Sequence, residues 1–222
     1  MRIRLGIGLS LVLILILGVI SGQAASISRA DDMTYKIVTF GTSLTARGGW
    51  QLPLQEALTK CLRRPVLVDA VARSGATSEW ALEKIGDVIA AKPDVVLVEF
   101  YANDAALNRF MTVGRSRQNM AMILGQLKQQ LPHARIIVMR MNPIFGIRGF
   151  IRPFINSYID AHRQLANEMG LDFYDNQPAW AELAPDELSA AIPDGSHPLP
   201  QAASAVIVPG LTQEIASGKC QN

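Results

Sequence analysis

Three residues near the two ends of the chain have the types that acyl transfer needs. Ser43 follows the apolar run at residues 35–40, and a serine placed where a strand ends can become a nucleophile. Asp194 precedes His197 by three residues in a loop rich in proline and glycine. Serine is a weak nucleophile at its own pKa, so it needs an adjacent base, and that base needs a third group to orient it. Ser43, His197 and Asp194 are the candidates for these roles.

Ester hydrolysis also needs hydrogen-bond donors for the negative charge that develops on the carbonyl oxygen. The backbone N–H of Ser43 is one candidate donor. Gly75 is a second, because glycine allows a close approach to its backbone N–H. The side-chain amide of Asn103 is a third. These three groups are the predicted oxyanion hole.

The candidate residues lie between short runs of β-branched residues and longer segments of helical period, which alternate along the chain. This alternation is typical of a parallel sheet covered by helices on both faces. The predicted strands lie at residues 36–40, 66–69, 95–100, 135–139 and 172–174. The predicted helices lie at residues 50–61, 77–91, 115–131, 153–169 and 200–217. Ligands of such sheets bind beyond the carboxyl ends of the strands, where all the candidate residues fall.

These motifs resemble the four sequence blocks of the SGNH hydrolases, also called the GDSL lipase/esterase family, over nearly all of the chain after the N-terminal segment. The blocks, in order, are Gly41-Thr42-Ser43-Leu44-Thr45, Gly75, Tyr101-Ala102-Asn103-Asp104 and Asp194-Gly195-Ser196-His197-Pro198. The resemblance implies a three-layer α/β/α, flavodoxin-like fold with about five parallel strands. It also implies Ser43 as nucleophile, His197 as base, Asp194 as its partner, and Gly75 and Asn103 as oxyanion donors.

Two positions depart from the family pattern. Thr42 stands where an aspartate is usual, and Ala102 stands where a glycine is usual. Neither replaces a proposed catalytic group, so we do not expect a complete loss of activity. Ala102 adds a methyl group near Asn103, which would narrow the pocket or shift Asn103, and we therefore expect a slower or more selective enzyme. Taken singly, each motif also has an ordinary structural interpretation, such as a helix cap at Ser43 or a turn at Gly75. The hydrolase interpretation rests on their combination.

Length and composition favour one exported domain. The chain has 222 residues, of which 49% are hydrophobic and 18% charged. Arg2 and Arg4 precede an apolar stretch and small residues, which predicts a signal peptide at residues 1–24, with an uncut membrane anchor as the alternative. A linker at 25–34 and one hydrolase domain at 35–222 follow. We expect a periplasmic or secreted protein, or a membrane-anchored one facing the exterior if the segment is retained.

Charge and cysteine content exclude several classes of protein. Removing Arg2 and Arg4 from the 21 Lys and Arg leaves 19, which equal the 19 Asp and Glu, so nucleic-acid binding has no electrostatic support. Cys61 and Cys220 form either a disulfide or two free thiols. The sequence has no CxxC or HExxH spacing, and we expect no metal and no cofactor.

An apolar stretch at residues 139–150 is expected to be a loop. It is either packed on the domain or forms an acyl or membrane-facing pocket walled by Ile144, Phe145, Ile147 and Phe150. In the second case, Arg148 and Arg152 contact anionic or sugar groups. A second wall is expected after Asn103, from Arg109, Met111 and Arg115. Glu99, His133 and His162 are interpreted as structural residues.

The residues together predict an exported serine esterase that acts on short-chain acyl esters, O-acetyl groups on a saccharide in particular. Lipid esters and thioesters remain open as substrates. An acyltransferase with the same triad is one alternative. A non-catalytic saccharide-binding protein on the same fold is another.

Overall fold

Five parallel strands form one sheet in the order β2-β1-β3-β4-β5. The strands are β1 (Tyr35–Gly41), β2 (Val66–Ala72), β3 (Val95–Glu99), β4 (Arg135–Arg140) and β5 (Asp172–Asp175). The structure is a computed structural model that describes residues 34–217 and Cys220. The signal peptide predicted at residues 1–24, and residues 25–33 of the predicted linker, lie outside the described residues.

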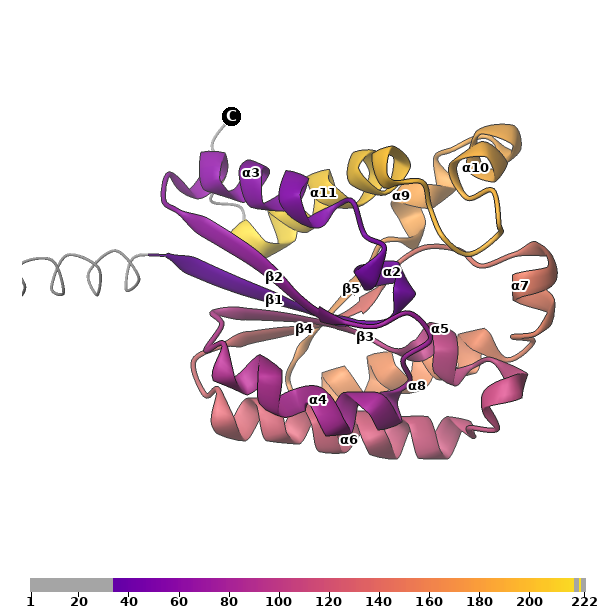
Figure 1. Cartoon of the computed structure of the whole chain (residues 1–222), viewed down its shortest axis with the longest axis horizontal. Helices are drawn as coiled ribbons and strands as arrows, with labels where there is room; N and C mark the ends of the chain where they lie inside the picture. Colours follow the sequence, from indigo (N-terminus) through magenta and orange to yellow (C-terminus); the bar gives the residue numbers. More distant parts are fainter. Residues whose placement is uncertain (1–33, 218–219, 221–222) are drawn as a thin grey trace, which may run out of the picture. The chain divides into compact units, whose positions relative to one another are not determined.

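Two layers of helices cover the sheet (Figure 1). Helices α3 (Gln51–Leu62) and α11 (Pro200–Ala216) pack together on one face. Helices α4 (Ser78–Ala90), α6 (Val113–Gln130) and α8 (Ile155–Glu168) cover the other. This is the predicted three-layer α/β/α fold, and all five predicted strands and five predicted helices are present, with ends shifted by up to three residues.

The short helices were not predicted from the sequence. They are α2 (Ser43–Ala46), α5 (Tyr101–Asp104), the 3₁₀ helix η1 (Leu107–Arg109), α7 (Gly146–Phe150), α9 (Gln177–Ala181) and α10 (Pro185–Ala191). Part of the stretch expected to be a loop is therefore helical at α7. Elements of one or two turns are too short to show a hydrophobic period, which explains why the pattern did not reveal them.

Alternation along the central strands builds two hydrophobic cores. Ile37 belongs to the core under α3 and α11, whereas Val38 and Phe40 belong to the core under α4 and α6. Successive side chains of a strand point to opposite faces, so a buried central strand must be apolar at nearly every position. On the second side, Phe40 packs edge-to-face against Phe100, with ring centroids 5.0 Å apart.

The strand order places a topological switch point at β1 and β3. The chain runs from β1 outward to β2 and then returns to β3 on the other side of β1. A crevice forms at the carboxyl ends of the strands where the order reverses. Ser43 lies two residues after the end of β1 and Asn103 four residues after the end of β3, so the fold brings the first and third sequence blocks to this crevice.

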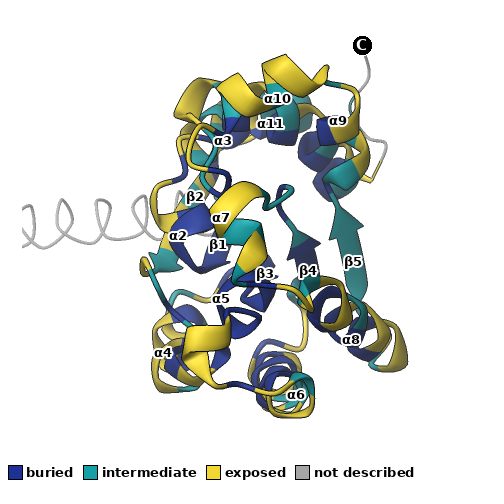
Figure 2. Ribbon diagram, turned by 90° about the vertical axis from the view of Figure 1, so that its right-hand side faces the viewer, coloured by how far each residue is buried: buried dark blue, intermediate teal, exposed yellow. Residues whose placement is uncertain are grey.

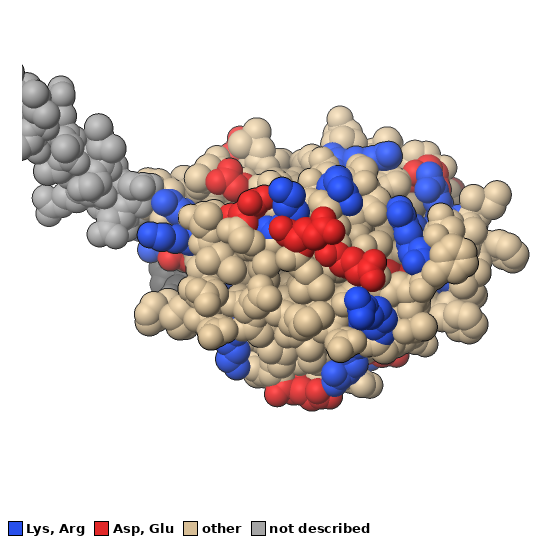
Figure 3. Space-filling model, turned by 60° about the horizontal axis from the view of Figure 1, so that its bottom comes forward, with Lys and Arg blue, Asp and Glu red and all other residues tan. Residues whose placement is uncertain are grey.

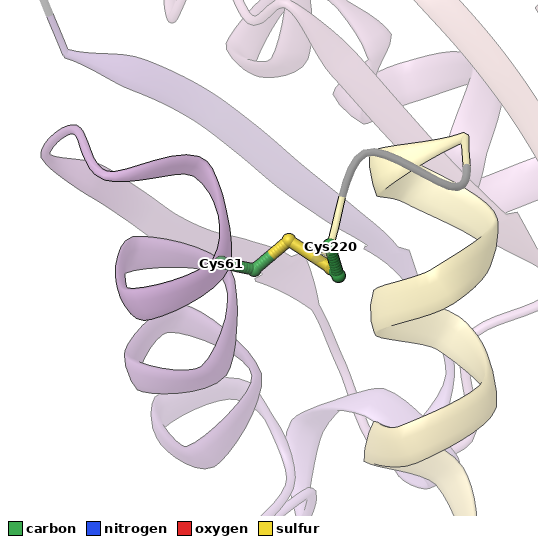
Figure 4. The surroundings of a disulfide bond; sticks show 2 residues. All are labelled: Cys61 and Cys220. Carbon is green, nitrogen blue, oxygen red and sulfur yellow. A yellow bond between two sulfur atoms is a disulfide. The ribbon is translucent and has the colours of Figure 1, made fainter. Parts of the chain in front are cut away.

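A disulfide joins Cys61, near the end of α3, to Cys220, beyond α11 (Figure 4). The two residues are 159 positions apart in sequence. The structure thus contains the disulfide that the sequence left open against two free thiols. Within the described part of the chain, no helix has both the length and the hydrophobicity needed to span a membrane.

Candidate active site

A buried carboxyl group, that of Glu99, makes hydrogen bonds to residues 42–45, here called the nucleophile loop. Glu99 ends β3 and is 2% exposed. Its Oε1 accepts hydrogen bonds from the Thr42 backbone N–H at 2.6 Å and from Thr45 Oγ1 at 2.8 Å, while Thr42 Oγ1 donates to its Oε2 at 3.1 Å. Gly41 is required here, since a Cβ on it would lie 2.3 Å from Glu99 Oε1. These contacts fix the turn from β1 into α2, which begins at Ser43.

The same contacts give a physical reason for Thr42, where the family resemblance expects aspartate. A threonine hydroxyl can donate to Glu99, whereas an aspartate would bring a second carboxylate against it. Burial raises the pKa of Glu99 to about 7, although the hydrogen bonds from Thr42 and Thr45 oppose the shift. The expectation that Glu99 is a buried structural residue agrees with its complete enclosure, and its place directly under the nucleophile loop is new.

The structure brings the three acyl-transfer candidates into one hydrogen-bonded row. Ser43 Oγ lies 2.8 Å from His197 Nε2, and His197 Nδ1 lies 2.6 Å from Asp194 Oδ2. A carboxylate can only accept, so His197 carries its proton on Nδ1 and leaves Nε2 free to accept the Ser43 proton. This arrangement has the geometry for general-base activation of a serine hydroxyl.

The loop that carries His197 is fixed by Asp194 itself. Asp194 Oδ1 accepts from the backbone N–H groups of Ser196 at 2.9 Å and His197 at 2.7 Å. Partial burial raises the pKa of Asp194, but the hydrogen bonds from the His197 ring and from these two N–H groups outweigh it and hold the pKa well below its usual range. Asn142, after β4, donates to Ser196 O at 2.9 Å and braces the loop from the body.

The three predicted oxyanion donors line one cavity with Ser43 Oγ. The Ser43 N–H lies in the first turn of α2, where N–H groups have no partner within the helix. Gly75 has a φ of +78°, in the left-handed region that favours glycine. Asn103 Nδ2 donates to Ala76 O at 2.8 Å, which leaves its second amide proton for the cavity. The geometry thus supplies donors from three different loops.

A buried polar network anchors α5, and with it Asn103. Asp104 accepts from the Ser78 backbone N–H at 2.9 Å and from Ser116 Oγ at 2.6 Å. Ser116 Oγ also lies 2.8 Å from His162 Nε2. Burial lowers the pKa of His162 to about 4 and raises that of Asp104. His162 is therefore structural, as predicted, and neutral.

The cavity beside Ser43 has a volume of about 170 Å³. Its lining residues are Ser43, Arg47, Ser74, Gly75, Asn103, Ala106, Asn108, Arg109, Arg148, Ile151, Arg152 and His197. Figure 2 shows the short helices α2 and α5 buried, while α7 is largely exposed. The cavity is thus bounded by short helices and loops on a rigid sheet.

The predicted substrate-binding residues are placed differently from one another. Arg148 lines the cavity, but Phe145 and Ile147 do not. Phe145 is half-buried, and its backbone N–H donates to Gly195 O at 2.8 Å, so it supports the His197 loop. Ile147 and Phe150 are each 81% exposed. One part of the stretch is packed on the body, and another part faces solvent.

The predicted second wall is only partly present. Arg109 lines the cavity, whereas Met111 is buried and Arg115 pairs with Glu79 on α4. Arg47, which lines the cavity, had no predicted role. The only sequence signal for Arg47 was its position four residues after Ser43. The short helix α2, which connects the two residues, was not predicted. Within residues 34–217 and Cys220, no group of three His, Cys, Asp or Glu side chains is arranged to hold a metal ion.

Comparisons with known proteins agree with the fold and the motifs. The model of the GDSL-like lipase/acylhydrolase family matches residues 38–204. No curated protein matches the chain. A catalytic mutant of an acetylxylan esterase from Geobacillus stearothermophilus is similar in structure, with a TM-score of 0.69 and 20% identity over 85% of this chain and 97% of that one.

Two further solved structures are similar. A lipase/acylhydrolase from Enterococcus faecalis has a TM-score of 0.63 and 24% identity over 81% of this chain and 96% of that one. A GDSL-like lipase from Bacteroides thetaiotaomicron has a TM-score of 0.61 and 18% identity over 82% of this chain and 88% of that one. At these identities the likeness shows a shared fold, while the family match covers most of the chain. The chain is therefore a carboxylic ester hydrolase that belongs to the GDSL-like lipase/acylhydrolase family.

Proposed function

We propose that the protein is an exported serine esterase that hydrolyses short acyl esters, O-acetyl esters of saccharides in particular, through Ser43, His197 and Asp194. The row of hydrogen bonds from Ser43 Oγ through the His197 ring to Asp194 carries this proposal. It stands beside a cavity that is also lined by Gly75 and Asn103.

In the first half of the reaction, Ser43 Oγ attacks the ester carbonyl carbon while His197 Nε2 takes the serine proton. Asp194 stabilises the imidazolium that forms. The carbonyl oxygen becomes an oxyanion and accepts hydrogen bonds from the N–H groups of Ser43 and Gly75 and from Asn103 Nδ2. The intermediate then expels the alcohol, which takes the proton from His197, and the acyl group stays on Ser43.

In the second half, a water molecule attacks the acyl group and gives its proton to His197. Collapse of the second oxyanion returns the proton to Ser43 Oγ and releases the carboxylic acid. The enzyme is then in its starting state, with no net change in the protein. No step needs a cofactor, since the base and the oxyanion donors are all protein groups.

The size of the cavity supports a short acyl group. About 170 Å³ holds a small acyl group and part of the alcohol, whereas an octanoyl chain would extend beyond the cavity. The similar acetylxylan esterase supports a saccharide as the alcohol. The proposed partners are thus a small acyl ester or an O-acylated saccharide.

Export has two independent supports. The N-terminal residues have the layout of a signal peptide, and disulfides such as Cys61–Cys220 persist in oxidising compartments. We propose a periplasmic or secreted location, with membrane attachment only if residues 1–24 are retained. The mass of the protein isolated from cells distinguishes the two forms, because cleavage removes the N-terminal segment.

The proposed activity is tested with p-nitrophenyl acetate, butyrate and octanoate. We expect the wild-type rate to fall from acetyl to octanoyl, and we expect Ser43→Ala and His197→Ala to lose roughly 10³-fold or more in kcat, because either change removes a member of the triad. Equal background rates in all three proteins would overturn the esterase assignment and leave a binding protein on this fold. Product analysis with a sugar acceptor distinguishes hydrolysis from transfer.

A further inference from the structure

Four arginines line the cavity beside Ser43, and they come from four different places in the chain. Arg47 follows α2, Arg109 ends η1, Arg148 lies in α7, and Arg152 lies between α7 and α8. The lining residues include no Asp or Glu. The closest carboxylate is Asp194, which is bound to His197 and lies 3.8 Å from Arg148 Nη2. The cavity is therefore strongly positive.

Five of the eight arginines elsewhere on the described domain have a carboxylate partner, and two of the others, Arg64 and Arg73, lie over aromatic rings. On the helical layer of α4, α6 and α8, Arg115 pairs with Glu79, Arg117 with Glu168, and Arg163 with Asp160. Figure 3 shows acidic and basic side chains interspersed on the face that this layer forms. At the cavity, by contrast, no described carboxylate lies within 4.0 Å of Arg47, Arg109 or Arg152. The cavity thus gathers three arginines that have no carboxylate partner among the described residues, one of which is buried.

Arg152 is the most informative of the four. It is 6% exposed, and its guanidinium contacts only neutral oxygens. Nε donates to Ala102 O at 2.6 Å, Nη1 donates to Arg148 O at 2.8 Å, and Nη2 lies 3.5 Å from Asn103 Oδ1. Burial lowers the pKa of Arg152, and the charges of Arg148 and Arg109 add to this effect. A buried cation without an anion is costly, and an anionic ligand would offset that cost.

The distance from Arg109 to the oxyanion site limits where such an anion can be. A Cβ placed on Gly75 would lie 3.0 Å from Arg109 Nη2, so this guanidinium sits directly over the predicted oxyanion glycine. Arg152 also lies near the predicted oxyanion donor Asn103, since its Nη2 is 3.5 Å from Asn103 Oδ1. An anionic group bound by these arginines is therefore only a few bonds from the ester carbonyl.

We propose that the cavity selects esters that carry a carboxylate or phosphate a few bonds from the scissile carbonyl, held by Arg47, Arg109 and Arg152. This inference rests on the proposed esterase function and narrows its substrate class. Guanidinium groups bind planar carboxylate and phosphate oxygens in pairs, which gives both affinity and orientation. An acidic sugar unit or a phosphorylated alcohol that bears an acyl group has this chemistry.

Matched ester pairs test the proposal. On the alcohol side, 4-acetoxybenzoate and 4-acetoxyphenyl phosphate are compared with the neutral methyl 4-acetoxybenzoate. On the acyl side, mono-4-nitrophenyl glutarate is compared with 4-nitrophenyl pentanoate. We expect a wild-type kcat/KM about 10–100-fold higher for an anionic member than for its neutral counterpart, as one or two charge-assisted hydrogen bonds allow. Comparing the alcohol-side pairs with the acyl-side pair shows on which side of the ester the arginines bind the anion. Comparing the benzoate with the phosphate shows which anion they prefer.

Variants assign the preference to the arginines. The double variant Arg47→Gln/Arg109→Gln is expected to bring the ratio of kcat/KM for the charged ester to kcat/KM for its neutral counterpart close to one, because only the charged ester loses charge-assisted contacts. Arg152→Lys keeps a buried cation and is expected to lose part of the preference. Arg63→Gln, at the opposite end of the sheet after α3, is the matched control and should behave as wild type. Equal losses on charged and neutral esters would overturn the proposal, as would a wild type without preference.

A binding measurement separates this proposal from the esterase assignment. Thermal unfolding of the Ser43→Ala protein is followed with inorganic phosphate and, at equal ionic strength, with sodium chloride. We expect phosphate to raise the Tm, and to do so only when Arg47 and Arg109 are present. If no ester is hydrolysed but phosphate still stabilises through these arginines, the esterase function fails and the anion site stands. If neutral esters are hydrolysed but phosphate does not raise the Tm, the anion site fails and the esterase function stands.

Discussion

Two sets of serine, histidine and aspartate lie within this domain, and only one faces a cavity. In the first, His197 stands between Ser43 and Asp194. In the second, Ser116 stands between Asp104 and His162. A hydroxyl has a single proton, and Ser116 Oγ donates it to Asp104 Oδ2, so His162 Nε2 must donate to Ser116 rather than accept from it. The order of the three groups thus directs the serine proton toward a base in one set and away from it in the other.

Solvent access separates the two sets further. Ser116 and Asp104 are fully enclosed and His162 is 2% exposed, whereas the side chains of His197 and Asp194 are 15% and 37% exposed. Enclosure lowers the pKa of His162 to about 4, so it stays neutral. The same three residue types therefore form the proposed catalytic set where they meet a cavity and a structural anchor where they are buried.

Replacing each aspartate by asparagine is the strongest test of this difference. Asp194→Asn removes the acceptor that fixes the His197 tautomer, and we expect kcat to fall by roughly 10³–10⁴-fold with little loss of stability. The matched change Asp104→Asn is expected to cost about 1–3 kcal/mol of unfolding free energy, because a buried donor loses its partner, and to change kcat far less. Ester assays and urea unfolding of both variants measure these effects. Similar kinetic losses in the two variants would contradict the comparison.

The pH dependence of stability tests the buried set. His162 has a pKa of about 4 when folded, against 6.5 as the ordinary value. The unfolded chain binds more protons between these values, so the contribution of His162 is complete above pH 6.5 and is lost as the pH falls through 4. The loss is on the order of 3 kcal/mol at most.

His162→Gln keeps a side-chain donor but does not titrate, so its unfolding free energy should fall less than that of wild type between pH 6.5 and 4. Urea unfolding at several pH values measures the slope of the unfolding free energy against pH for each protein. The control is His133→Gln at an exposed position, which should keep the wild-type slope. An unchanged slope in His162→Gln would show that the imidazole is not held neutral by the fold.

An effect of similar size and opposite sign is expected at Glu99, which is hydrogen-bonded to the nucleophile loop. Glu99 has a pKa of about 7 when folded, against 4.5 as the ordinary value, so its contribution to stability is complete below pH 4.5 and is lost as the pH rises through 7. Glu99→Gln keeps an acceptor for the Thr42 N–H and should leave kcat within about threefold, as expected for a group that only positions the loop. Relative to wild type, the variant should be more stable at pH 8 than at pH 5.

The exposed change Glu83→Gln is the control for this measurement, because it removes one carboxylate without touching the nucleophile loop. Its stability relative to wild type should be the same at both pH values. A large loss of kcat in Glu99→Gln would instead show that the charge of Glu99 itself acts on the reaction.

The sequence predicted the long elements, and it singled out Ser43, His197 and Asp194, which the structure brings together, for a physical reason. Buried parallel strands such as β3 must be apolar throughout, and a strand end followed by Gly41 and Ser43 marks a turn at the sheet edge. The Asp194 and His197 spacing is local, so it is visible without the fold. The α/β fold and the family were therefore predictable from the apolar runs, from the residues at the ends of the strands and from short motifs.

The remaining features depend on which distant residues the fold brings together. Arg47 had no predicted role, and although Arg109 and Arg152 were expected near the substrate, no local pattern shows that the three arginines line one cavity. His162 lies in a helix, where a single histidine does not reveal what faces it from α6. Phe145 was expected to contact substrate because it is apolar, yet its backbone supports the loop of His197.

The disulfide between Cys61 and Cys220 has a consequence for how the domain responds to proteases. The 159-position span between the two cysteines includes β2 to β5, the loops that carry Asn103 and His197, and all the exposed apolar residues of α7. A single cut anywhere in this span leaves two fragments that stay covalently joined. A nicked molecule therefore keeps the mass of the whole chain plus one water, and it separates into two pieces only after reduction.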